Sequence, residues 1–323
     1  MLVTGGAGFI GFHLSRHLAG QGYDVTICDN FFRGSRDDEL KALLKQPNVS
    51  LIECDMADSS CVTLLGAGYD YVYHLAAING TRYFYEIPDK VLRVNILSAI
   101  NVLDWFVKSG SGKILFASSC EAYASNKDLP LPTPEDVPLA VSDVKNSRFS
   151  YGGSKIAGEL LFYNYAKVHK FRMTILRYHN LYGPRMGFEH VVPEFCMRLI
   201  KKEDPFRIIG GKDTRSFCYC DDGVRATQQV MESEKTDGEI IHTGNSTEEI
   251  SIVDLAGRLM DIAGFHPEIK VSPAPEGSVN RRCPDLTKIK ALTGYEPEIM
   301  LEDGLKKTLA WYRDNHFGHK LAK

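Results

Sequence analysis

The chemistry of this chain is indicated first by Tyr151 and Lys155, which lie four residues apart in the stretch Tyr-Gly-Gly-Ser-Lys. On a helix, two side chains at this spacing share a face. An ammonium group and a cationic nicotinamide ring near a phenol lower its pKa, which makes the phenolate a usable base toward a sugar hydroxyl. Ser118 and Ser119 end a predicted strand, and one of their hydroxyls would complete a triad around the reacting group. A tyrosine and a lysine at this spacing are also common on helix surfaces, so the prediction depends on the surrounding elements.

The first of those elements is the N-terminal stretch, where a short apolar run leads into Gly5, Gly8 and Gly11. Such a pattern is typical of a strand, a tight turn and a helix whose N-terminus faces a pyrophosphate. An ordinary strand-to-helix turn is the alternative, but a second predicted strand ends in Asp29, at about the distance expected for a dinucleotide site. We therefore predict that Gly5, Gly8, Phe9, Ile10 and Gly11 contact a dinucleotide.

The type of dinucleotide is indicated by Asp29, which is followed by Asn30. A carboxylate here accepts hydrogen bonds from both ribose hydroxyls and repels a 2′-phosphate, so we expect NAD rather than NADP. Arg33 complicates this expectation, and we interpret it as a solvated loop arginine. Further cofactor contacts are expected where the next strands end, and on the helix after the fourth strand: Asp55, Met56, Leu75, Ala76, Ala77 and Asn95.

The whole N-terminal half alternates between predicted strands and helices. Strands are expected near residues 1–4, 23–28, 49–55, 69–77, 113–119 and 173–178, and helices over 12–20, 91–108 and 151–169. This alternation predicts an α/β fold, a Rossmann-type doubly wound parallel sheet with its ligands at the carboxyl ends of the strands. Beyond Asn180 the alternation fades, which indicates a smaller C-terminal substrate-binding domain. We expect an NAD-binding domain over 1–180 and a nucleotide-sugar-binding domain over 181–323, with some later segments returning to the first domain.

Composition limits the classes of partner. The chain has 323 residues and a formal charge of −3, so we expect neither nucleic acid nor a membrane as a partner. Eight cysteines are scattered without the spacing of a metal site, and we predict no metal. We interpret them as reduced thiols of a cytoplasmic protein, and we expect Cys218 and Cys220 on one face of a strand.

Taken together, the motifs resemble those of extended short-chain dehydrogenases/reductases, in the group of NAD-dependent nucleotide-sugar epimerases, dehydratases and decarboxylases. The matching stretches are VTGGAGFIG, Asp29-Asn30, Asp55-Met56, HLAA, SSCEAY, YGGSK, RYHNLYGPR, TRSFCYCDD and RRCPD. The resemblance implies that Tyr151 is the base, that Lys155 is its partner and binds the nicotinamide ribose, and that Ser119 bonds to the sugar O4, with Ser118 beside the cofactor. It also implies that Asn180, Arg215 and Arg282 hold a nucleotide diphosphate and that Asp285 contacts its ribose. Arginine suits that role because its charge is permanent and its guanidinium group is planar.

The reaction implied by this resemblance begins with oxidation of the sugar at C4. The resulting 4-ketosugar is then reduced on its other face, dehydrated, decarboxylated or epimerised at a neighbouring carbon. A protein that binds NAD without catalysis is a further hypothesis, but such proteins are expected to have lost the tyrosine, the lysine or the diphosphate arginines. A net-oxidising dehydrogenase or an NADPH-dependent reductase is another.

The branch is indicated by Ser119-Cys-Glu-Ala-Tyr123. Glu121 resembles the glutamate of 4,6-dehydratases and UDP-glucuronate decarboxylases, and it is placed to abstract a proton made acidic by a C4 ketone. Cys120 resembles the cysteine of UDP-apiose/xylose synthases and of the 5,6-dehydratase of tunicamycin assembly, and it either transfers a proton or packs. Arg148 is decarboxylase-like, whereas Phe84 stands where decarboxylases usually have a tyrosine toward the sugar carboxylate, and Asn79 matches none of the well-known members. We expect an epimerase/dehydratase, with a UDP-glucuronate decarboxylase or apiose/xylose-synthase-like enzyme as the alternative.

Quaternary structure is indicated by the helices over 91–108 and 152–169, which resemble the pair that forms a four-helix dimer interface in this group. Apolar side chains on the second helix support a homodimer, although packing within one chain accounts for many of them equally well. They are Leu160, Leu161, Tyr163 and Tyr165.

Overall fold

The central feature of the computed structural model, which describes residues 1–124, 128–274 and 279–316, is a seven-stranded sheet. Its strand order is β11-β6-β5-β4-β1-β2-β3, and every neighbouring pair is parallel. The strands are β1 (Leu2–Thr4), β2 (Val25–Asp29), β3 (Val49–Glu53), β4 (Tyr71–His74), β5 (Lys113–Ser119), β6 (Arg172–Tyr178) and β11 (Ile240–Thr243). This is the doubly wound Rossmann-type sheet that the sequence predicts, with one strand more than the six expected.

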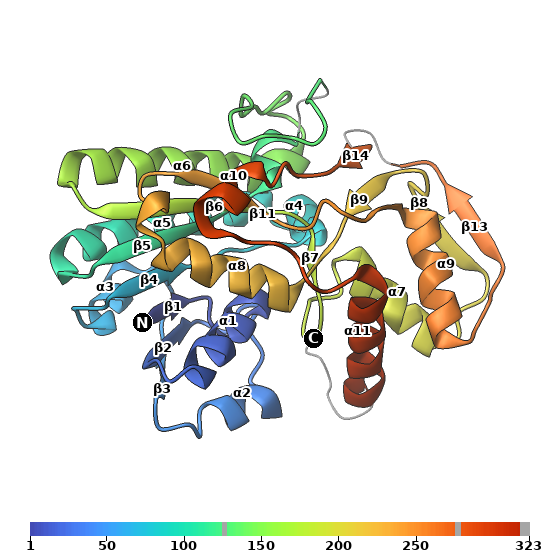
Figure 1. Ribbon diagram of the computed structural model, residues 1–323, viewed down its shortest axis with the longest axis horizontal. Helices are drawn as coiled ribbons and strands as arrows, with labels where there is room; N and C mark the ends of the chain where they lie inside the picture. The colour runs from blue at the N-terminus through green and yellow to red at the C-terminus, as the bar shows by residue number, and fades with distance from the viewer. Residues whose placement is uncertain (125–127, 275–278, 317–323) are drawn as a thin grey trace.

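Helices cover both faces of this sheet (Figure 1). One face is covered by α3 (Ser59–Val62), α5 (Pro88–Ser109) and α6 (Ser150–His169), and the other by α1 (Phe9–Gly20) and α8 (Cys220–Glu232). Short helices occupy the connections: α2 (Asp38–Leu43), η1 (Thr63–Leu65), α4 (Thr81–Glu86), η2 (Cys120–Tyr123), η3 (Ser147–Phe149), η4 (Glu234–Thr236) and α10 (Thr287–Thr293). Each face therefore has its own buried apolar core, which is expected where a sheet is covered on both sides.

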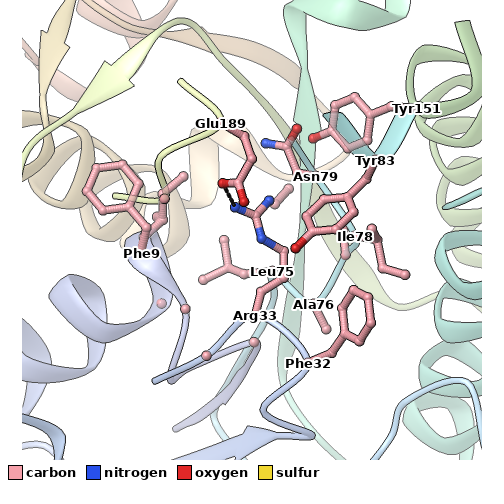
Figure 2. Close-up of a pocket in the computed structure, with 18 of the residues that line it drawn as sticks. Phe9, Phe32, Arg33, Leu75, Ala76, Ile78, Asn79, Tyr83, Tyr151 and Glu189 are labelled. Atoms are coloured by element: carbon pink, nitrogen blue, oxygen red, sulfur yellow. Dashed lines mark hydrogen bonds and ion pairs between the residues drawn. The ribbon is translucent and has the colours of Figure 1, made fainter. Parts of the chain in front are cut away.

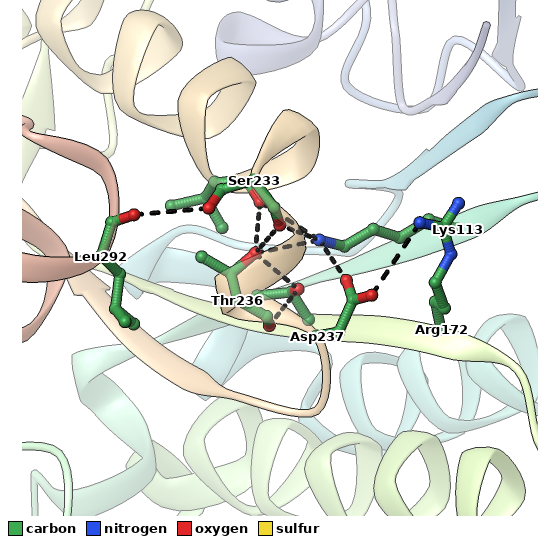
Figure 3. A network of polar contacts seen from close by, with 8 residues as sticks. Lys113, Arg172, Ser233, Thr236, Asp237 and Leu292 are labelled. Atoms are coloured by element: carbon green, nitrogen blue, oxygen red, sulfur yellow. Dashed lines mark hydrogen bonds and ion pairs between the residues drawn. The ribbon is translucent and has the colours of Figure 1, made fainter.

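The extra strand, β11, belongs to the C-terminal half of the sequence and pairs with β6. Lys113, at the start of β5, fixes the preceding segment: its buried Nζ donates to the carbonyl oxygens of Val230 and Ser233 and to the Thr236 hydroxyl, and lies 2.7 Å from Asp237 Oδ1 (Figure 3). The lysine thereby satisfies backbone carbonyls at the end of α8 that the helix itself leaves unpaired.

The remaining elements form a smaller lobe beyond the carboxyl ends of the strands, to the right in Figure 1. They are β7 (Leu181–Tyr182), α7 (Val191–Ile200), β8 (Phe206–Ile209), β9 (Thr214–Ser216), β10 (Cys218–Tyr219), β12 (Glu249–Ser251), α9 (Ile252–Ala263), β13 (Ile269–Ser272), β14 (Arg281–Arg282) and α11 (Leu301–His316). Their apolar side chains make a separate core in which α7, α9 and α11 pack together.

The cysteines are free and lie on different kinds of element. Cys218 lies on β10, but Cys220 begins α8, so the prediction that both share one face of a strand is wrong. The local alternation was misleading because the helix starts directly after Tyr219. All eight cysteines are free thiols, and within the described residues no helix is long and apolar enough to cross a membrane.

Candidate active site

A cavity of about 810 Å³ lies where the carboxyl ends of β1, β2, β4 and β5 face the smaller lobe. Its wall includes the glycine turn, Asp29, the Ser119 to Glu121 segment and Tyr151, which come from distant parts of the sequence. Figure 2 shows Phe9 on one side of this space and Asn79, Tyr83 and Tyr151 on the other.

The glycine turn at one end of the cavity has little room for side chains. Gly5 has φ +69°, and a Cβ on it would lie 2.8 Å from the backbone nitrogen of Ala76. A Cβ on Gly11 would lie 2.7 Å from Gly6 Cα, so α1 packs directly on the turn. Gly8 caps α1 without a side-chain hydrogen bond. The amides of the first helical turn are therefore available to an anion, which fits the pyrophosphate of a dinucleotide.

Asp29 lies beside this turn with its carboxylate held in place by the backbone. Its Oδ2 accepts a hydrogen bond from the Ala7 amide at 2.9 Å, and its Oδ1 accepts one from the Phe31 amide at 2.7 Å. Burial raises the pKa of Asp29, while these amide bonds oppose the shift. Each oxygen keeps a second lone pair for a ribose hydroxyl, so the residues present fit an adenosine ribose.

Tyr151 and Lys155 lie on the first turns of α6, next to the end of β5. The Lys155 Nζ donates to the carbonyl oxygen of Ala117 at 2.7 Å and lies 5.5 Å from the Tyr151 ring centroid. Ser119 lies at the end of β5, and its hydroxyl accepts a hydrogen bond from the Glu121 amide at 3.2 Å. All three residues line the cavity, as the triad requires.

The lowered pKa predicted for Tyr151 depends on a nicotinamide cation, and the protein by itself has the opposite shift. Burial, followed by the nearby Glu121 carboxylate, raises the pKa of Tyr151 above its ordinary value, and a hydrogen bond from Ser119 only partly opposes this. Burial also lowers the pKa of Lys155 to about 7, which weakens the cationic field that the sequence argument assumed. The phenol is therefore protonated until a further positive charge enters the cavity.

Glu121 is held between two arginines. Its Oε1 lies 2.8 Å from Arg282 Nη1, and its Oε2 lies 3.6 Å from Arg148 Nη2. Burial alone would raise the pKa of Glu121, but the charges of Arg282 and Arg148 outweigh burial and lower it. The carboxylate is thus ionised at neutral pH and borders the same cavity as Tyr151.

Cys120 packs rather than ionises. Its thiol is buried against Tyr123 and Val137, and burial raises its pKa. Of the two interpretations that the sequence left open, this environment favours the packed side chain.

Most predicted site residues lie on the cavity wall. The cofactor set there comprises Gly5, Gly8, Phe9, Ile10, Gly11, Asp29, Asn30, Asp55, Met56, Leu75, Ala76, Ala77 and Ser118, and the substrate set comprises Asn79, Phe84, Asn180 and Arg282. The Ser118 hydroxyl nevertheless donates to Glu159, and the Phe84 ring stacks on Tyr151, with centroids 5.1 Å apart.

Four predicted residues lie behind that wall. The Asn95 amide bonds to both backbone groups of Ile78 and to Ser154, so it braces the loop after β4. The Arg148 guanidinium faces Glu121. Arg215 is beside Arg282 in the β9–β14 pair and donates to the Thr214 carbonyl oxygen, and the Asp285 carboxylate accepts a hydrogen bond from the Thr287 amide.

The interpretation of Arg33 as a solvated loop residue is wrong. Its guanidinium lies in the cavity, with Nη2 3.0 Å from Glu189 Oε2 (Figure 2). Sequence reasoning did not find Glu189 as a functional residue, because nothing local links positions 156 residues apart. His190 and Tyr312 are further cavity residues that carried no sequence signal.

Away from this cavity, His13, Cys220 and Asp221 bring three potential metal-ligand atoms within 4.8 Å of one another. Both ring nitrogens of His13 are already in hydrogen bonds, one with the Pro184 carbonyl oxygen and one with Arg16. This cluster is therefore a polar contact between α1 and the start of α8 and offers no free imidazole nitrogen to a metal.

Comparison with known proteins gives consistent matches along the chain. The model of the NAD dependent epimerase/dehydratase family matches residues 1–244. A UDP-N-acetyl-alpha-D-glucosaminuronate decarboxylase of Bacillus cytotoxicus is 35% identical, with 97% of each chain covered. Among solved structures, a UDP-glucose 4-epimerase of Thermotoga maritima with UDP-glucose has a TM-score of 0.86 at 31% identity, covering 98% of this chain and 99% of that one. A dTDP-glucose 4,6-dehydratase of Streptomyces venezuelae with NAD and TYD bound has a TM-score of 0.89 at 26% identity, covering 99% and 98%.

Proposed function

Because this chain belongs to the NAD-dependent epimerase/dehydratase family, we propose that it oxidises a nucleotide-diphosphate sugar at C4 and then removes a proton beside the new ketone. The protein is an NAD-dependent nucleotide-sugar enzyme that acts through a 4-keto sugar. Glu121 is the residue proposed to carry the second step, removal of the proton.

The first step depends on Tyr151, Ser119 and Lys155. When bound in the cavity, NAD would supply a hydride acceptor for C4 and a hydride donor for the return step, so the overall reaction would be redox-neutral. Once Tyr151 is ionised, its phenolate oxygen takes the proton from the sugar C4 hydroxyl. Ser119 orients that sugar hydroxyl from the end of β5. Lys155 offers its remaining Nζ protons to a ribose hydroxyl.

The second step is carried by the ionised Glu121 carboxylate, whose side chain is 17% exposed, on the wall shared with Tyr151. A proton on the carbon next to a ketone is acidic, and a positioned carboxylate is a suitable base for it. Removal of that proton leads to dehydration or to epimerisation at the neighbouring carbon. A simple 4-epimerase needs no such group.

Decarboxylation is the second candidate, and the position of Arg282 on the cavity wall favours it. A substrate carboxylate would compete with Glu121 for Arg282, which borders the cavity, and planar guanidinium groups bind carboxylates well. The similarity to the Bacillus cytotoxicus decarboxylase along 97% of this chain supports this candidate.

The two candidates are separated by incubation with UDP-, dTDP-, GDP- and CDP-sugars and their uronic acids in D2O, followed by mass spectrometry and NMR. We expect a product that carries solvent deuterium on the carbon next to C4. Its mass should otherwise show either the loss of water or no loss of atoms from the sugar. Loss of carbon dioxide would support decarboxylation instead. If the only product is the 4-epimer and it contains no solvent deuterium, a base role for Glu121 is contradicted.

The nucleotide diphosphate is proposed to bind where β9 and β14 place Arg215 and Arg282 side by side. Asn180, at φ +41°, lies near the same strands and donates to the Ser216 carbonyl oxygen. We propose a cofactor-binding unit over 1–180, completed by α8 and β11, and a substrate-binding unit from the other elements of 181–323.

We further propose a cytoplasmic homodimer formed by α5 and α6, since both helices expose apolar side chains. The exposed residues are Leu92, Val107, Leu160, Tyr163 and Val168. Small-angle scattering at low concentration should give the mass of two chains, and Leu160→Glu should reduce it to one. A monomeric wild-type protein would refute this assembly.

A further inference from the structure

The cavity contains an ion pair that joins the two halves of the molecule. Arg33 follows β2 by four residues, and Glu189 lies two residues before α7. Arg33 Nη2 and Glu189 Oε2 are 3.0 Å apart, and Figure 2 shows them meeting inside the cavity, between Phe9 on one side and Tyr83 on the other.

Two glycines make room for this pair. A Cβ on Gly187 would lie 2.6 Å from Arg33 Nη2 and would also collide with Glu189 Oε2. A Cβ on Gly80, from the loop before α4, would lie 3.1 Å from Arg33 Nη1 and 3.3 Å from Glu189 Cβ. The guanidinium also lies 5.4 Å from the Tyr83 ring centroid, within cation–π range. Gly187, Gly80 and the Tyr83 ring thus all lie against the ion pair.

A second ion pair joins the same two segments but is more buried. Arg185 Nη2 lies 2.7 Å from Asp37 Oδ2, and the Arg185 side chain is only 3% exposed. Arg33 and Glu189 retain 21% and 17% side-chain exposure and line the cavity. The Arg185 pair therefore fixes the contact between the segment after β2 and the segment before α7. The Arg33 pair is accessible to water and can open.

We propose that Arg33 and Glu189 form a clasp that closes the cavity over bound NAD and sets the rate at which NAD is released. A redox-neutral reaction needs the same cofactor for both hydride steps, so premature release would stop turnover. The clasp lies between the lobe that holds the adenosine ribose, at Asp29, and the lobe that covers it. The inference rests on the cofactor assignment of the proposed function and goes beyond it to cofactor retention.

The test measures how fast NADH leaves the protein. Protein loaded with NADH is mixed with excess NAD, and the change in NADH fluorescence gives the release rate. Arg33→Gln and Glu189→Gln should each release NADH about tenfold faster, because loss of a partly buried charge pair acts mainly on dissociation. The charge-swapped double variant Arg33→Glu/Glu189→Arg should recover slower release than either single variant.

Gly187→Ala offers a variant that keeps both charges. Its new methyl group meets only the flexible ends of the two side chains, so it should separate the pair without unfolding the protein and should speed release similarly. Arg36→Gln is the matched control, because Arg36 lies on the same loop but pairs with Glu53 at the surface. Its release rate should equal that of the wild type.

Three outcomes would overturn the clasp. Release at the wild-type rate from both Arg33→Gln and Gly187→Ala would overturn the clasp, and so would a change in KM for the sugar nucleotide with unaltered NADH release. A wild-type protein that takes up no NADH would overturn the cofactor assignment together with the clasp.

Discussion

At the scale of single residues, Tyr151 is defined by its burial. The phenol lies between Phe84 and the end of β5, and its pKa is raised by burial and by Glu121. Burial disfavours the phenolate, so the positive charge that makes Tyr151 a base has to come from the cofactor.

We predict that Tyr151→Phe keeps NAD binding but loses turnover about a hundredfold to ten-thousandfold, the usual contribution of one general base. Cofactor content of the purified variant and its turnover of the accepted sugar nucleotide provide the measurement. Turnover like that of the wild type would contradict the proposed mechanism.

Phe84 allows the effect of burial to be measured. Phe84→Ala removes the stacked ring and admits water, so the pKa of Tyr151 should fall and the limb of the pH–rate profile that depends on Tyr151 should shift to lower pH. Phe188→Ala is the control, because Phe188 also lines the cavity but its ring contacts Tyr312. Equal shifts in both variants would mean that the stack has no special role.

At the scale of elements, Gly158 sets the distance between α6 and β5. A Cβ at this position would lie 2.8 Å from Cε1 of the Phe116 ring, and that ring also lies 4.8 Å from Lys155 Nζ. Close packing at Gly158 therefore positions Tyr151 and Lys155 relative to Ser119.

Gly158→Ala should lower the free energy of unfolding by about 1–3 kcal/mol through overpacking and should also reduce turnover. Gly153→Ala on the same helix is the matched control, since its Cβ would meet Val141 at an ordinary 3.7 Å. That change should be neutral or stabilise by up to about 1 kcal/mol. Chemical denaturation of the two variants compares them directly, and equal stabilities would refute the packing role of Gly158.

At the scale of the whole molecule, buried histidines make stability depend on pH. Burial lowers the pKa of His13 to about 4 and of His74 and His242 to about 3, from an ordinary 6.5. Below pH 6.5 the unfolded chain binds protons at these residues and the folded chain does not until its own pKa is reached.

Stability should therefore be greatest above pH 6.5 and should fall as the pH drops toward 4, by up to about 1.4 kcal/mol per pH unit for each histidine. Urea denaturation at several pH values measures this slope. His242→Asn should make the slope shallower by the contribution of one histidine. A slope that stays flat between pH 6.5 and 4.5 would contradict the neutral buried state of these rings.

The sequence by itself determined the elements whose signals are local. The glycine turn, Asp29 at a strand end and the Tyr151 to Lys155 spacing each lie within a few residues, so they predicted the parallel sheet and a dinucleotide site. β11 was missed because it lies beyond Asn180, where the alternation of strands and helices fades and no local pattern assigns Ile240–Thr243 to the sheet.

Only the tertiary structure decided what depends on burial and on contacts between distant segments. The pairing of Glu121 with Arg282 and of Arg33 with Glu189 joins positions 161 and 156 residues apart, which no local pattern can relate. The pKa of Tyr151 likewise follows from desolvation in the folded cavity, which residue spacing does not measure. Local spacing specified which groups are present, and folding decided their charge states and their partners.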